Sequence, residues 1–154
     1  IMYQKKFSKE KLKVFHPGGN IGNSLLLAED IMNIGKKMPV INYKKNIKEA
    51  LKIMNHKKLG IVVITKNRLI KGLLTDGDLR RELNNYSQEK NLYNFIKKPP
   101  FVVNENMPAS KALAIMNEKK ITTLLVVSDK DYNRSNKTLR GIIHIHFLLQ
   151  NGIK

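Results

Sequence analysis

The stretch Ala50–Asn55 reads ALKIMN, and it returns almost unchanged as ALAIMN at Ala112–Asn117. One residue after each copy, a lysine pair follows in the same register, at positions 57–58 and 119–120. Self-similarity of this kind indicates that one supersecondary unit occurs twice in the chain. The repeat therefore predicts two similar units in tandem.

Both copies of the repeat lie in amphipathic helices. Apolar residues recur at spacings of three and four, which is the pattern of one buried helix face. The first helix begins at a capping box formed by Asn46 and Glu49, and Pro108 suits the first turn of the second. The two predicted stripes are Ile47, Ala50, Leu51 and Met54, and Ala109, Ala112, Leu113 and Met116.

Two short apolar strands and a short helix follow each repeat helix. The strands are rich in β-branched residues, so we expect both of their faces to be covered. The second copy has a longer polar connection between its strands, residues 129–138, which predicts a mobile loop. The predicted strands are Gly60–Ile64, Lys71–Thr75, Thr122–Val127 and Arg140–His144, and the short helices are Leu79–Leu83 and Phe147–Leu149.

One such unit would bury too little apolar surface to be stable alone. We therefore expect an α+β fold in which the two units pack by pseudo-twofold symmetry around a shared core. The expected division is 1–30 for the end of another domain plus a linker, 31–85 for the first unit, 86–98 for a linker and 99–154 for the second unit.

Composition narrows the class of partner. The chain has 154 residues, no cysteine and a formal net charge of +17. It has no apolar run of about 18 residues and no signal-peptide core, so we expect a cytoplasmic protein without membrane contact. Lysine far outnumbers arginine, and aromatic residues are not interleaved with the charges, so we do not expect a nucleic-acid partner. The charge favours small anionic ligands.

Two motifs carry a family resemblance. Asp30–Met32 (DIM) precedes the first unit, and Gly72–Leu79 (GLLTDGDL) ends it. The repeat resembles the CBS motif, a β-α-β-β-α unit named after cystathionine β-synthase. Pairs of these motifs form a Bateman module, and the resemblance implies a cleft that binds adenine nucleotides or other small anions.

A longer ordered set of motifs is similar to the C-terminal half of bacterial arabinose-5-phosphate isomerases. It consists of His16–Gly22, Asp30–Met32, Thr75–Arg81 and Gly141–His146. The resemblance implies a regulatory piece of an enzyme that interconverts ribulose 5-phosphate and arabinose 5-phosphate for Kdo and lipopolysaccharide synthesis. Residues 1–30 would then hold the end of the sugar isomerase domain. His16 would contribute to the parent active site, while the chain itself would not be an enzyme.

Thr75 and Asp78 are the first candidate ligand residues. Thr-x-x-Asp at a strand-to-helix turn can form a capping box, and it can also offer a carboxylate to ribose hydroxyls and a hydroxyl to phosphate. Both interpretations stay open, and the two roles can coexist. Arg80 and Arg81 follow within one turn, where either could reach a phosphate or simply lie on a solvated helix face.

The second unit departs from this pattern. His144 takes the position of Thr75, and Phe147 takes that of Asp78, so no carboxylate is available there for a ribose. Thr122 and Thr123 could still offer hydroxyls. We expect at most one conventional ribose clamp, or a ligand other than an adenine nucleotide, such as a CMP-linked sugar acid. We expect no required cofactor.

Three other functions are disfavoured by the residues present. His144 and His146 could share a zinc ion, but the sequence offers no clear third ligand, so we expect no metal site. The affinity of a nucleic-acid binder would fall steeply as the salt concentration rises. A self-contained enzyme would need a nucleophile and a base, and the sequence shows no such pair. The main alternative is a homodimerising module that binds no ligand.

Overall fold

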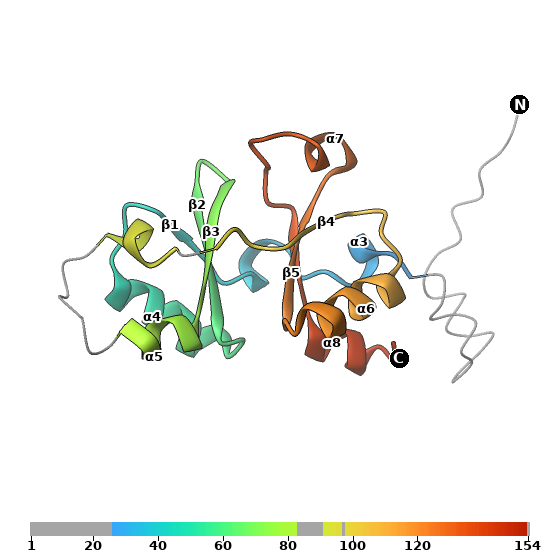
Figure 1. Cartoon of the computed structure of the whole chain (residues 1–154), viewed down its shortest axis with the longest axis horizontal. Coiled ribbons are helices and arrows are strands. Elements are labelled where there is room, and N and C mark those ends of the chain that lie inside the picture. Colours follow the sequence, from blue (N-terminus) through green and yellow to red (C-terminus); the bar gives the residue numbers. More distant parts are fainter. Residues whose placement is uncertain (1–25, 83–90, 97, 154) are drawn as a thin grey trace, which may run out of the picture.

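The computed structural model describes residues 26–82, 91–96 and 98–153 and shows two three-stranded sheets with helices packed on them (Figure 1). His16 lies outside the described residues. The helices are α3 (Ala28–Ile31), η1 (Gly35–Lys37), α4 (Ile47–Lys57), α5 (Asp76–Glu82), η3 (Leu92–Phe95), α6 (Ala109–Lys119), α7 (Asp129–Tyr132) and α8 (Ile145–Gln150). The strands are β1 (Val40–Asn42), β2 (Ile61–Lys66), β3 (Leu69–Thr75), β4 (Val102–Asn104), β5 (Thr123–Val127) and β6 (Gly141–His144).

The first unit runs β1-α4-β2-β3-α5, with β1 parallel to β2 and β3 antiparallel to it. Helix α4 begins as predicted, because the Asn46 side chain accepts from the Glu49 amide at 3.0 Å while Glu49 accepts from the Asn46 amide. It ends at Lys58, whose φ of 56° reverses the chain in the left-handed region. This geometry turns the chain directly into β2.

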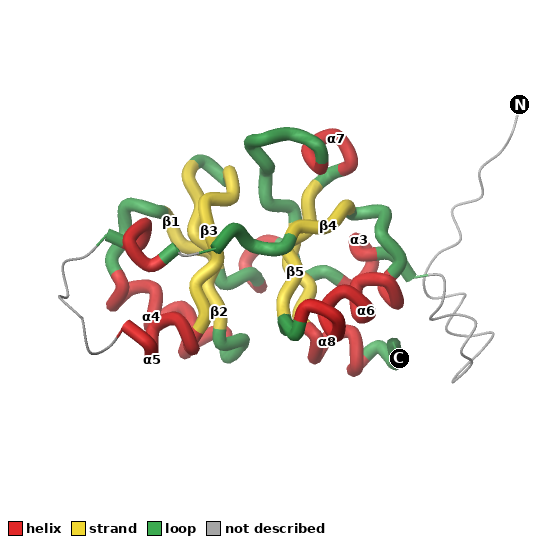
Figure 2. The backbone as a smooth tube through the Cα atoms, in the orientation of Figure 1, coloured by secondary structure: helices red, strands yellow, loops and turns green. Residues whose placement is uncertain are grey.

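The second unit repeats this order as β4-α6-β5-β6-α8, and the two units lie side by side in Figure 2. Its repeat helix ends at Lys120, with a φ of 53°, at the position equivalent to Lys58. The α+β fold of two β-α-β-β-α units is therefore confirmed. Pro108 stands just before α6 as its N-cap residue and not inside its first turn.

Each sheet has two buried faces. The outer face of the first sheet packs on α4, through residues such as Val62 and Ile64, and the outer face of the second packs on α6 and α8. The inner faces pack against each other, with Ile61 and Val63 of β2 meeting Leu125 and Ile142 of the second sheet. Strand burial on both faces follows from this arrangement.

Two short segments are exchanged between the units. Helix α3 precedes the first unit but joins the core of the second, where the Ala28 amide donates to Met107 at 2.7 Å. Helix η3 precedes the second unit but joins the core of the first, where Leu92 and Phe95 are buried. The exchange obeys the pseudo-twofold relation of the repeat. The division of the chain at residues 31, 86 and 99 stays a prediction.

The two hairpins differ in length. Asn67 and Arg68 close β2–β3 as a two-residue turn with positive φ, whereas residues 128–140 connect β5 to β6. We expected a mobile loop there; the structure has the one-turn helix α7 in this connection, capped by Ser128. The end of the connection then joins the first unit, because the Leu139 amide donates to the Arg68 carbonyl at 3.0 Å. This long-range pairing brings the two hairpin ends together.

Gly72 and Gly141 are the equivalent points at which the exchanged segments touch the sheets. A Cβ on Gly72 would lie 2.6 Å from Ile96 Cδ1, just after η3, and one on Gly141 would lie 2.6 Å from Met32 Cγ, just after α3. Both distances are far below van der Waals contact. Glycine at these positions therefore allows each exchanged segment to pack closely against the sheet.

We predict that Gly72→Ala lowers the free energy of unfolding by about 1–3 kcal/mol, because Ile96 is β-branched and cannot move aside without strain. Urea denaturation measures the change. Gly77→Ala is the matched control, since its Cβ would meet only Arg81 Nη1 at 3.4 Å. The control should differ from wild type by less than about 1 kcal/mol. Equal loss in both variants would contradict the packing argument.

Candidate functional site

Both predicted ligand positions lie at the same end of the interface between the sheets. Thr75 ends β3 and pairs with Ile61, while His144 ends β6 and pairs with Thr123. Alternation along the strands places these residues on the inner faces. Because the two hairpins meet at the opposite end, α5 and α8 both begin at this end (Figure 1). We call residues 75–78 the first lip and residues 144–147 the second lip.

The first lip is a closed hydrogen-bond network. Asp78 Oδ2 accepts from the Thr75 amide at 2.9 Å and from the Thr75 hydroxyl at 2.7 Å. The Asp78 amide in turn donates to the Thr75 hydroxyl oxygen at 3.1 Å. This is a capping box with Asp in place of Glu, and it starts α5 at Asp76, three residues earlier than predicted. The structure thus contains the capping box that the sequence predicts. The same hydrogen bonds hold the Asp78 carboxylate at the end of β3.

Two arginines follow this carboxylate on α5. Arg81 pairs with Asp78 Oδ1, and Arg80 pairs with Asp76 at 2.8 Å on the exposed side of α5. Burial acts to raise the pKa of Asp78, but the hydrogen bonds from Thr75 and the pairing with Arg81 together outweigh it and lower that pKa below its ordinary value. Asp78 is therefore an anionic acceptor at neutral pH, with the exposed Arg81 guanidinium paired to it.

The second lip replaces this network with an aromatic cluster. His144 is only 5% exposed and serves as the N-cap residue of α8, where its Nδ1 accepts from the His146 amide at 3.3 Å. The ring centroids of His146 and Phe147 lie 4.7 and 6.0 Å from that of His144. Phe147 thus occupies the place of the carboxylate, as the sequence predicts.

The two threonines beside the second lip differ. Thr122 is exposed, and its carbonyl accepts from the Ile145 amide at 2.9 Å, which joins the start of β5 to the start of α8. Thr123 is buried on the inner face directly opposite His144. Its hydroxyl oxygen has no hydrogen-bond partner within the described part of the chain. The sequence placed both residues here but could not separate their environments.

His144 must be neutral to act as this cap, because a protonated imidazole has no lone pair to accept with. Burial, followed by the nearby His146, lowers the pKa of His144 below its ordinary value of 6.5. Both effects favour the form that the cap requires. In that form the hydrogen of the ring is carried by Nε2.

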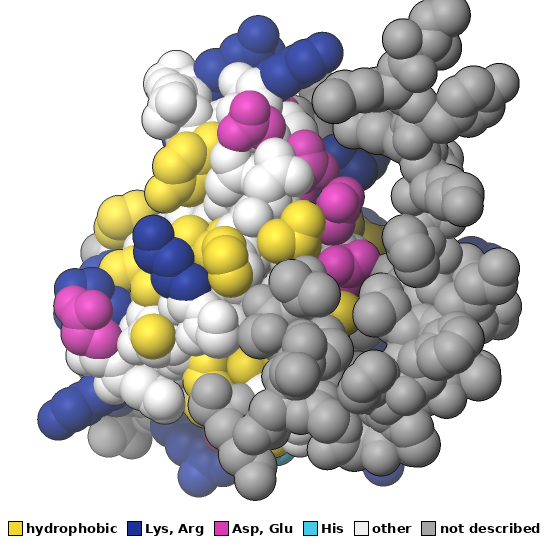
Figure 3. Space-filling model, turned by 90° about the vertical axis from the view of Figure 1, so that its right-hand side faces the viewer, with side chains coloured by type: hydrophobic (Ala, Val, Ile, Leu, Met, Phe, Trp, Pro, Cys, Tyr) yellow, Lys and Arg dark blue, Asp and Glu magenta, His cyan; other side chains and the backbone are white. Residues whose placement is uncertain are grey.

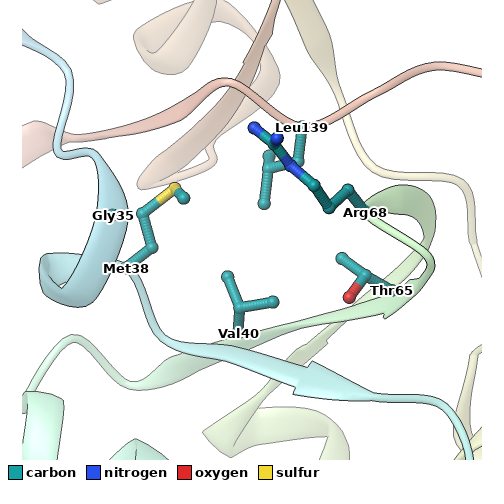
Figure 4. A pocket seen from close by; sticks show the side chains of 6 residues that line it. All are labelled: Gly35, Met38, Val40, Thr65, Arg68 and Leu139. Carbon is teal, nitrogen blue, oxygen red and sulfur yellow. The ribbon is translucent and has the colours of Figure 1, made fainter.

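A separate pocket of about 130 Å³ lies at the hairpin end of the interface (Figure 4). Its size is below that of typical nucleotide-sized sites, which occupy about 300–1,000 Å³. The sequence did not point to it, because the approach of Leu139 to the Asn67–Arg68 turn is a long-range contact. It is lined by Gly35, Met38, Val40, Thr65, Arg68 and Leu139.

The surface carries charges of both signs. On the face seen in Figure 3, Lys and Arg side chains are scattered, and most of the visible Asp and Glu side chains lie in one row. Among residues 26–82, 91–96 and 98–153, no three His, Cys, Asp or Glu residues are grouped so that they could hold a metal ion. No helix in the same ranges is long and apolar enough to cross a bilayer.

Comparison with known proteins agrees with this architecture. The family model described as "CBS domain" matches residues 28–85 and 92–146. The arabinose 5-phosphate isomerase KdsD of Yersinia pestis is 35% identical over 99% of this chain and 46% of the relative. An uncharacterized protein of Rickettsia prowazekii, RP505, is 34% identical over 99% of this chain and 46% of its own length. The chain thus spans about half the length of these relatives.

The fold also matches a solved structure. The crystal structure of CBSX2 in complex with AMP has a TM-score of 0.68, is 20% identical, and covers 82% of this chain and 95% of that chain. At this identity the match shows the fold alone.

We predict that His144 makes folding pH-dependent. Since its folded pKa lies below the ordinary 6.5, the unfolded chain binds more protons at acid pH. The stabilising contribution is therefore complete above about pH 7 and declines as the pH falls through 6.5 toward the folded pKa. Urea denaturation at about pH 7.5 and about pH 5 measures the slope.

His144→Asn keeps a neutral capping side chain and should flatten this slope. The control His56→Asn changes an exposed residue of α4 and should keep the wild-type slope. Identical slopes in wild type and His144→Asn would show that His144 does not titrate on unfolding.

Proposed function

This chain belongs to the CBS domain family, and from that premise we propose that it is a regulatory module that binds an adenine nucleotide or a nucleotide-linked sugar between its two motifs. The observation that carries the proposal is the Asp78 carboxylate. Thr75 holds it at the end of β3, and the hydrogen bonds from Thr75 and the pairing with Arg81 lower its pKa and keep it ionised. A carboxylate held in this way can accept hydrogen bonds from both hydroxyls of a ribose. We propose no catalytic step and no required cofactor for the chain.

The ligand would rearrange the charges of the first lip. Ribose hydroxyls that donate to Asp78 Oδ1 would compete with Arg81, whose side chain is 65% exposed. Arg80 is 76% exposed and paired only with Asp76 in the contacts described. Exposed ion pairs of this kind contribute only about 0–1 kcal/mol, so both guanidinium groups can turn toward a phosphate at small cost. Arginine also suits phosphate because its donors form a planar fork.

The parent protein is proposed to be an arabinose-5-phosphate isomerase, and the chain its regulatory part. Support comes from the relatives of that name, which match nearly the whole chain but are about twice as long.

We also propose that the module acts as a homodimer in the cytoplasm, with Thr122, Thr123 and His144 completing the ligand site from the second motif. The CMP-linked sugar acid made downstream of the isomerase is a candidate feedback ligand.

We predict that the protein binds at least one of AMP, ATP and CMP with saturation in calorimetry, and that Asp78→Asn weakens this binding about tenfold or more. The loss is expected because the amide presents one acceptor oxygen where the carboxylate presents two charged ones. Glu118→Gln removes the same charge from an exposed position on α6 and should bind as wild type does.

A different result would favour the alternative function. Absence of heat with every nucleotide at millimolar concentration, together with a constant dimeric mass in light scattering, would favour the ligand-free oligomerisation module. The second lip gives that alternative its support, since Phe147 cannot accept from a ribose.

We predict that the coding sequence upstream of Ile1 specifies a sugar isomerase domain. The corresponding full-length protein should interconvert ribulose 5-phosphate and arabinose 5-phosphate, as a coupled sugar-phosphate assay can measure. Asp78→Asn in that protein should leave the rate without nucleotide unchanged and reduce the response to nucleotide. An inactive full-length protein, or an unrelated upstream domain, would exclude the isomerase assignment.

A further inference from the structure

The pocket at the hairpin end of the sheet interface has apolar walls and a volume of about 130 Å³. In Figure 4, Val40 of β1 lies below the pocket, Met38 lies at one side, and Leu139 lies above it. All three side chains belong to the apolar cluster between the sheets. An apolar cavity of about 150 Å³ can hold a molecule as large as benzene, so this pocket is large enough for a small organic group.

Arg68 supplies the charge at this pocket. Among the six described residues that line it, Arg68 is the charged one, and its side chain extends along the pocket toward Leu139 in Figure 4. Its guanidinium has no ion-pair or hydrogen-bond partner in the part of the chain that the structure describes. Thr65 is the other polar side chain of the lining, and its hydroxyl already donates to the Ile41 carbonyl at 3.4 Å. The lining therefore offers one cationic donor that no carboxylate of the pocket neutralises.

The backbone holds Arg68 in an unfavourable conformation. Asn67 and Arg68 form the two-residue turn between β2 and β3, with φ of 50° and 66°. Turns of this kind favour Asn followed by Gly, because both central residues have positive φ. Asn67 fits this preference, whereas an arginine in the left-handed region is strained. Strained residues of this kind cluster at ligand sites, so the Arg68 side chain is a candidate ligand group.

The pocket breaks the pseudo-twofold relation of the two units. One of its walls comes from the long connection 128–140, which takes the place of the short turn in the second unit. The Leu139 amide donates to the Arg68 carbonyl at 3.0 Å, and the Ile70 amide donates to the Lys137 carbonyl at 2.9 Å. These bonds fix the wall beside the turn. Both motifs thus contribute to the pocket, at the end of the interface away from the two lips.

We propose that this pocket binds a small organic monocarboxylate. Its carboxylate would pair with the Arg68 guanidinium at the rim, and its short hydrocarbon part would contact Met38, Val40 and Leu139. The planar fork of arginine matches a carboxylate in a bidentate pair. Inorganic phosphate fits less well, because it has no apolar part and would lose hydration against apolar walls. The proposal goes beyond the nucleotide-binding function, and its site shares no residue with either lip.

The methyl group of Met38 reports on occupancy of the pocket. The chain has six methionines, so protein labelled with ¹³C at the methionine methyl groups gives few NMR signals, and Met38→Leu assigns the relevant one. Met54 and Met116 are buried in the two outer cores and serve as internal references. The protein is titrated at constant ionic strength with propionate, with propionamide as its uncharged analogue, and with inorganic phosphate.

We expect propionate to shift the Met38 signal with saturation and a dissociation constant below about 5 mM, while the reference signals stay in place. Propionamide and phosphate should bind about tenfold more weakly or less. Absence of a saturable shift with propionate would overturn the proposal. A response to phosphate as strong as that to propionate would overturn it too, because it would indicate a general anion site.

Arg68→Gly separates ligand binding from folding. Glycine suits the positive φ of the turn, so this variant should unfold at the same urea concentration as wild type or a higher one, while propionate binding weakens about tenfold or more. Lys66→Gln is the matched control, because it removes a charge from the other face of the same hairpin, where Lys66 Nζ lies 5.3 Å from the centroid of the Tyr43 ring. It should bind propionate as wild type does. Wild-type binding by Arg68→Gly, or an equal loss in both variants, would show that Arg68 does not hold the ligand.

Discussion

The contact between the inner faces of the two sheets is the constraint on which the rest of the molecule depends. Each sheet has only three strands, and its inner face is formed by side chains such as Val63 and Leu125 that are completely buried. Neither face can leave water except by packing on the other. At about 1.5–3 kcal/mol for each large apolar side chain removed from water, this contact offsets an appreciable part of the ordering entropy of the chain. It also brings the two lips to one end of the interface.

The exchange of α3 and η3 reinforces this contact. Each segment covers part of the core of the unit that it does not precede in sequence, and glycine at 72 and 141 allows the close approach. The interface and the exchange therefore act together, so the two motifs should unfold as one cooperative unit. A ligand held between the motifs would be sensitive to any change in their relative position.

The sequence was sufficient for the features that depend on local pattern. The repeat at Ala50 and Ala112, the apolar stripes, the Asn46 cap and the Thr75–Asp78 turn were all predicted, because each follows from spacing and residue type. The sequence could not predict that Leu139 pairs with Arg68 or that α3 and η3 exchange places. Those features depend on contacts between residues far apart in the chain, which periodicity does not report. The free hydroxyl of Thr123 belongs to the same group, since satisfaction of a polar atom is a property of its surroundings.

The packing of α3 has a mechanical consequence. The chain passes from Leu26 into contact with the start of α6, because the Ala109 amide donates to the Leu26 carbonyl at 2.8 Å. The described chain therefore starts on the second motif, while the Asp78 carboxylate belongs to the first. A displacement produced at the first lip can reach Leu26 across the sheet interface, along the backbone through Asn33, which is bridged to Ile142, or along the chain from η3 into β4. The Asp78 carboxylate and Leu26 thus lie on different motifs, on the two sides of the sheet interface.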